Sequence, residues 1–200
     1  MSRTIALLVA GGFFLACAAP ADPTTPEGAY RLFADGFSGR DYGQVYSRVD
    51  SVTRSQFNLY LDSTRAVIDL IDRRYPPKLK QSALKDLTVQ FDDASFSPDE
   101  LLFHKSDTAC FMIFCEKMFA HQSQVKTLVQ QFGSRIETTV PRTHNEVSII
   151  SVAGDTLLFK LEKDGEWRTA EIFGPSFNHL ARLSQKNLAV IRLNLEVFAK

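Results

Sequence analysis

The sequence lacks several features that would assign a function class directly. It has no basic excess, because Lys+Arg and Asp+Glu both number 23, and a surface that binds nucleic acid normally requires one. It contains neither a phosphate loop, in which Gly-Lys-Ser/Thr ends a glycine-rich turn, nor the Gly-x-Ser-x-Gly turn of serine hydrolases. Its longest apolar run has about twelve residues, whereas a membrane span needs ~20. The sequence therefore argues against a nucleic-acid-binding protein, a P-loop protein and a membrane-spanning protein.

The N-terminus carries the strongest signal in the chain. A single positive charge at Arg3 precedes an apolar run from Ile5 to Ala16, and Cys17 follows directly. A charged start, a short apolar segment and a small residue at its end are typical of a secretory signal. Because the run closes on a cysteine, it resembles a bacterial lipoprotein signal. We therefore expect residues 1–16 to be a signal peptide, Cys17 to be lipidated and residues 17–25 to form a short linker.

An acylated Cys17 would anchor the protein to a membrane, because two lipid chains already give stable attachment. Ala18 follows the cysteine where enterobacterial proteins kept in the inner membrane carry Asp, so this resemblance favours the outer membrane, with the domain facing the periplasm. Two alternatives stay open. Ala16, Ala18 and Ala19 also suit ordinary cleavage and release into the periplasm, and the apolar start could instead be buried in a cytoplasmic chain.

Two further cysteines, Cys110 and Cys115, lie in a segment with helical spacing. In a helix, Cα atoms five residues apart are roughly 8–9 Å from each other, which is beyond the ~7 Å limit for a disulfide. We expect two buried free thiols, while a disulfide remains open if the chain turns between them. The intervals that join these cysteines to His104 and His121 do not match common structural zinc sites. No metal site and no cofactor site are predicted.

Apolar residues recur three or four positions apart along the first two thirds of the chain, which predicts amphipathic helices. Thr24 with Glu27 as a capping box, or Thr25 followed by Pro26, predicts the start of the first helix. Pro76-Pro77 ends the third, because proline lacks the amide donor. Asp41 is the expected cap of the second helix, and Ser51 or Thr53 is the expected start of the third. The expected helices cover residues 24–38, 42–49, 51–75, 80–87, 107–121 and 123–132, with a further start at 97–103.

The pattern changes to strands after residue 133. Four segments, 134–140, 146–152, 156–162 and 167–173, are rich in strand-forming residues, and Asp164-Gly165 predicts a tight hairpin. Gly174-Pro175 then starts a long helix with an apolar stripe. The predicted fold is α+β, with N-terminal helices packed on a C-terminal four-stranded antiparallel meander, a helical insertion and a long C-terminal helix. We expect a single domain over residues 26–200.

Three short segments support a resemblance to a known family. They are Thr25–Phe33, Asp41-Tyr42 and Leu161–Arg168, the last containing Lys-Asp-Gly-Glu-Trp-Arg. This order resembles bacterial lipoproteins with a nuclear transport factor 2-like, cystatin-like domain. The resemblance implies a curved sheet wrapped around helices to form a cone with an apolar cavity. The chain departs from the pattern in an insertion at residues 76–132 and in the helix after Pro175, either of which could fill or cover the cavity.

Enzymes of that fold, such as isomerases and dehydratases, place an acid or base in the cone. Asp92-Asp93 lies between Phe91 and Phe96 and is the one carboxylate pair that could serve, although a polar loop is the favoured interpretation. The main hypothesis is a non-catalytic lipoprotein that works by binding or in envelope assembly, with an apolar-ligand carrier or an enzyme as alternatives. The helix over Phe177–Phe198 is the candidate surface for an envelope protein partner.

Overall fold

The computed structural model describes residues 21–87, 89–91, 94–97, 102, 106–120 and 135–198. It confirms the α+β prediction: helices come first, a four-stranded antiparallel sheet follows and a long helix ends the chain. The elements are α1 (Pro26–Gly39), α2 (Tyr42–Ser47), α3 (Ser51–Arg74), α4 (Pro77–Lys85), β1 (Val89–Phe91), β2 (Ala94–Phe96), α6 (Asp107–Met118), β3 (Ile136–Thr143), β4 (Glu146–Ser151), β5 (Thr156–Leu161), β6 (Trp167–Thr169) and α8 (Gly174–Phe198).

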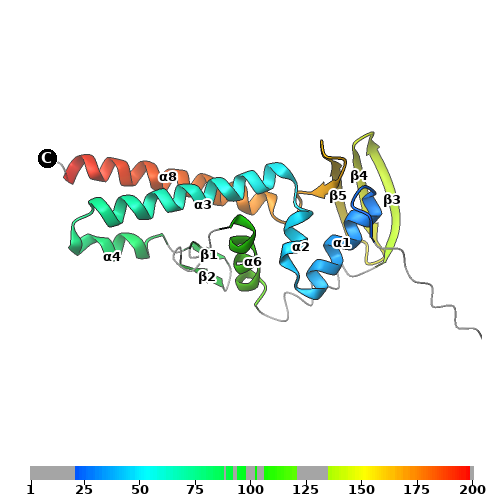
Figure 1. The fold of residues 1–200 in the computed structure, drawn as a ribbon, viewed down its shortest axis with the longest axis horizontal. Coiled ribbons are helices and arrows are strands. Elements are labelled where there is room, and N and C mark those ends of the chain that lie inside the picture. The colour runs from blue at the N-terminus through cyan, green and yellow to red at the C-terminus, as the bar shows by residue number, and fades with distance from the viewer. Residues whose placement is uncertain are drawn as a thin grey trace, which may run out of the picture.

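The molecule has two regions, which Figure 1 shows side by side. The body contains α1, α2, α6, the sheet β3–β6 and the first parts of α3 and α8. The arm consists of residues 65–87 and 182–198, in which α3 and α8 continue together away from the body and α4 doubles back beneath α3 (Figure 1). The 25 residues of α8 give it a length of about 37 Å at 1.5 Å per residue. The tip of the arm therefore lies far from the sheet.

The first three helices each begin at a side-chain cap. Thr25 accepts a hydrogen bond from the amide of Gly28, and Asp41 accepts one from the amide of Gln44, as the sequence predicted. α3 begins at Ser51, one of the two starts predicted from the sequence. Asp50 is the cap, because its carboxylate accepts the Thr53 amide at 2.7 Å. Each cap satisfies an amide that the first helical turn leaves unpaired.

The join between α3 and α4 differs from the sequence prediction. Tyr75 is extended, with ψ at 144°, and α4 then starts at Pro77 instead of residue 80. Proline suits the first helical position, because its missing N–H would have had no partner there. The double proline therefore ends one helix and starts the next, and α4 folds back along α3.

The pair β1–β2 is an antiparallel hairpin that the sequence did not predict.

The sheet is a meander in the order β3-β4-β5-β6, and all of its neighbouring strands are antiparallel. Gly165 has φ at +83°, which an L side chain rarely adopts, so the predicted Asp-Gly turn is confirmed. The last strand is shorter than expected and ends at Thr169. From there the chain turns inward, and Phe173 joins the core before α8 begins.

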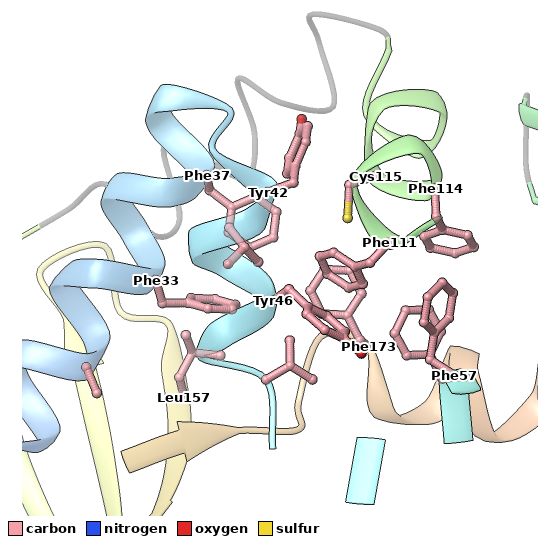
Figure 2. Close-up of a cluster of buried hydrophobic side chains, with 14 of the residues drawn as sticks. Phe33, Phe37, Tyr42, Tyr46, Phe57, Phe111, Phe114, Cys115, Leu157 and Phe173 are labelled. Carbon is pink, nitrogen blue, oxygen red and sulfur yellow. The ribbon is translucent and has the colours of Figure 1, made fainter. Parts of the chain in front are cut away.

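Aromatic side chains fill the centre of the body (Figure 2). Phe111 lies 4.7 Å from Tyr46 and 4.9 Å from Phe173, measured between ring centroids, and Phe57 lies 4.6 Å from Phe177. Many of the ring pairs meet edge to face, a geometry that aromatic pairs prefer. These rings join α2, α3, α6 and α8 into one core that continues to β4 and β5.

The arm has a separate and smaller core. Its buried members are Val67, Ile71 and Tyr75 from α3, Leu87 after α4, and Ile191 from α8. Asn194 donates a hydrogen bond to the Tyr75 hydroxyl at 3.0 Å. The arm therefore rests on a smaller, mainly aliphatic core with one ring pair, Tyr75 and Phe198 at 5.1 Å, whereas many rings surround one another in the body.

Candidate functional site

Several residues that the sequence singled out lie outside the described residues. They are Cys17, the Asp92-Asp93 pair, His104 and His121. The helix expected over residues 123–132 and the start at residues 98–100 lie outside them as well. The lipid anchor at Cys17 therefore stays a prediction from sequence.

Cys110 and Cys115 are buried within α6 and are not joined to each other by a disulfide, as the helical spacing predicted. Burial raises the pKa of both thiols, so both are protonated at neutral pH and poorly nucleophilic. His144 and His179 are exposed. Within the described ranges, no three His, Cys, Asp or Glu side chains lie close enough together to hold a metal ion.

The densest charged cluster surrounds Arg168 at the β5–β6 hairpin. Its guanidinium, which is almost fully buried, contacts Glu162 at 2.8 Å, Asp164 at 2.7 Å and Glu166 at 2.8 Å. Arg48 contacts Glu166 from α2 at 2.7 Å. The hydrogen bonds from Arg168 lower the pKa of Asp164 to about 2. Because cations on several sides already pair with these carboxylates, the cluster fixes the hairpin to α2 and leaves little free charge for catalysis.

The aromatic core offers little space for a substrate. The ring contacts bring α6 and α8 against α2 and α3 with centroid distances of 4.6–6.0 Å, which is direct packing. An enzyme pocket in a cone needs an open cavity with a few converging polar groups. The grooves described below lie instead along the arm.

An exposed row of apolar side chains lies on the distal half of α8. Val190, Leu193 and Val197 are 45%, 61% and 67% exposed, and their spacing of three and four residues places them on one face. This row is separate from the face that buries Ile191 against α3. The helix over Phe177–Phe198 is the partner surface predicted from the sequence, and its apolar residues divide into these two rows. The spacing of the row was visible in the sequence, but its exposure depends on where α3 lies.

A groove between α4 and α8 adjoins this row. It has a volume of about 290 Å³, and its walls are mainly apolar. Amide and hydroxyl groups of Asn187, Asn194, Ser82 and Tyr75 supply polar points along it. The side chains that line it are Tyr75, Leu79, Ser82, Ala83, Asp86, Leu87, Asn187, Val190, Ile191, Asn194 and Phe198.

A wider depression follows the seam between α3 and α8. It measures about 600 Å³, but charged side chains supply four of its seven lining residues. Those four are Asp69, Arg74, Arg192 and Glu196. The groove between α4 and α8 is therefore better suited to an apolar occupant, and it is the candidate site.

Comparison with protein-family models, with curated proteins and with solved structures gives no match to this chain. In the part of the chain that the structure describes, no helix combines the length and the apolar character needed to span a membrane. The inference of function therefore rests on the N-terminal sequence and on the geometry of the arm.

Proposed function

We propose that this protein is a lipid-anchored lipoprotein of a bacterial cell envelope that acts without catalysis, by binding a partner protein through its arm. The observation that carries the proposal is the exposed apolar row on α8. Leu193 and Val197 are more than half exposed, and contiguous apolar surface on a soluble domain commonly marks a binding site. The adjoining groove enlarges this surface, and Asp86 is the one charged side chain among the residues that line it.

The two ends of the molecule suit an anchor and a binding site. The described chain starts beside the sheet, where the Trp167 amide donates to the carbonyl of Pro23 at 2.9 Å. The C-terminus lies at the tip of the arm (Figure 1). A lipid on Cys17 would hold the body close to the membrane, since Pro23 is only six residues after Cys17 and six extended residues reach roughly 20 Å. The arm would then present its apolar row away from the attachment point.

The alternative functions gain less support from the geometry. An apolar-ligand carrier or an isomerase-like enzyme would use a cone-shaped pocket, and ring packing around Phe111 occupies the centre of the body (Figure 2). A small apolar molecule that copurifies with the protein would favour the carrier over a protein partner.

Native mass spectrometry of protein extracted in mild detergent from its own host tests the proposal. We expect a chain that begins at Cys17, carries three acyl chains and copurifies with a second protein. The double variant Leu193→Gln with Val197→Gln should lose the partner, and the control Val152→Gln, at an exposed turn of the body, should keep it. An unlipidated chain would show that Cys17 is not a lipid anchor. A partner that still copurifies with the double variant would show that the arm does not bind it through the exposed row.

A further inference from the structure

We propose, building on the function proposed above, that the groove between α4 and α8 binds an amphipathic helix of the partner that has acidic residues beside its apolar face. The apolar base of the groove comes from side chains on both helices, including Leu79, Val190, Ile191 and Phe198. A helix docked in such a groove uses apolar anchors three and four residues apart. Asn187 and Asn194 supply polar groups to the same lining, and Asn194 already donates one hydrogen bond to the Tyr75 hydroxyl.

The dimensions of the groove fit about three helical turns. Its α8 wall extends from Asn187 to Phe198, which corresponds to about 17 Å of helix axis. α4 and α8 both pack on α3 and are separated from each other by the groove. A helix placed there would contact both and complete a four-helix arrangement, which is a common way to cover apolar helix faces.

The charges around the groove favour an acidic occupant. Lys78 and Lys85 are exposed on α4. Lys78 lies four residues before Ser82 and Lys85 lies three residues after it, so both are neighbours of Ser82 on the helix surface. Lys186 is exposed on α8 one turn before Val190. Asp86 is the one acid among the lining residues. Both helices beside the groove, α4 and α8, therefore carry cations.

The whole arm shares this bias. It contains nine Lys and Arg against four Asp and Glu, although the complete chain has zero formal net charge. Complementary charge steers association and sets specificity. An acidic amphipathic helix could contact both the apolar lining of the groove and the lysines beside it. A flat anionic membrane would contact the lysines without filling the groove.

Photo-crosslinking in the full chain, in its own host, tests the inference. A photoreactive phenylalanine is placed singly at Leu79, Ser82, Val190 or Asn194, and at Val52 on the body as a control. Mass spectrometry then maps the residues to which each probe attaches. We expect the four groove positions to attach to one segment of the partner, at residues three or four apart and flanked by Asp or Glu, and the control to attach elsewhere.

Charge reversal provides a second readout. Lys78→Glu, Lys85→Glu and Lys186→Glu together should lower the crosslinking yield about tenfold. The matched control reverses three exposed cations of the body, Arg31, Arg135 and Lys163, and should leave the yield unchanged.

The remaining outcomes separate the two proposals. If a partner copurifies but the groove positions give no crosslinks to it, the groove is not the binding site, while the proposed binding function stands. Loss of both would overturn the binding function as well. Attachment to lipid, to a second copy of this chain or to a segment without helical spacing would also overturn the acidic-helix inference, as would an unchanged yield after charge reversal.

Discussion

The body and the arm share two helices but bury very different surfaces along them. Near the body, α3 and α8 contribute Phe57 and Phe177 to a cluster of rings. Farther along, the same helices bury only Val67, Ile71 and Ile191 with their neighbours. Large aromatic side chains bury more area than aliphatic ones. One pair of helices thus serves as a rigid support at one end and as a more weakly held surface with exposed apolar residues at the other.

This difference can be measured because the two regions have separate probes. Trp167, the one tryptophan of the chain, is buried in β6 and reports on the body. Circular dichroism at 222 nm is sensitive to all helices, including the arm. The two signals therefore separate unfolding of the body from unfolding of the arm.

The largest effect is expected for Phe111→Ala in the body. Phe111 is 0% exposed, and truncating a buried phenylalanine typically costs about 3–5 kcal/mol, because the transfer energy is lost and a cavity remains. Urea unfolding followed by Trp167 fluorescence should show the midpoint falling accordingly. The neighbouring Met112→Ala, at a side chain that is 37% exposed, should cost less than about 1 kcal/mol. Equal effects at the two positions would mean that the ring cluster is not the main core.

A smaller and localised effect is expected for Ile71→Ala in the arm. Ile71 is fully buried in the arm core, so its truncation should cost about 2–3 kcal/mol. Because this core is a cluster separate from the rings, the helical signal at 222 nm should be lost at lower urea than the Trp167 signal. Leu59→Ala, at a partly exposed position of α3 in the body, should leave the two transitions together. Coincident transitions in Ile71→Ala would show that arm and body unfold as one unit.

Much of this architecture could be predicted from the sequence, because local chemistry determines it. The caps at Thr25 and Asp41 and the turn at Gly165 depend on a few adjacent residues. The candidate site was harder to predict, because it depends on how α4 folds back after Tyr75. Val190 and Ile191 are adjacent and both apolar in the sequence. Only the packing on α3 decides that Ile191 is buried and Val190 is exposed.

A pH-dependent effect is expected at the hairpin of the body. Arg168 lowers the pKa of Asp164 from 3.8 to about 2 in the folded protein, so the folded state favours the ionised carboxylate. The stabilisation is present above pH ~4 and is lost as the pH falls towards 2. Asp164→Asn keeps a residue that suits the turn before Gly165. It should therefore lower the urea midpoint clearly more at pH 7 than at pH 2, where most of the stabilisation is lost, and an equal difference at the two pH values would contradict the ion-pair account.

The smallest effect on stability is expected on the exposed row of the arm. Leu193→Gln with Val197→Gln replaces two apolar side chains that lie mostly in water, and glutamine is a good helix former. The free energy of unfolding should therefore change by no more than about 0.5 kcal/mol for each substitution. Ile191→Gln on the same helix would bury an amide without a partner, so it should cost about 2 kcal/mol or more. If Leu193→Gln with Val197→Gln lowered the free energy of unfolding as much as Ile191→Gln, the exposed row would already be buried in the isolated protein, as in a dimer. It would then not be free to bind a partner.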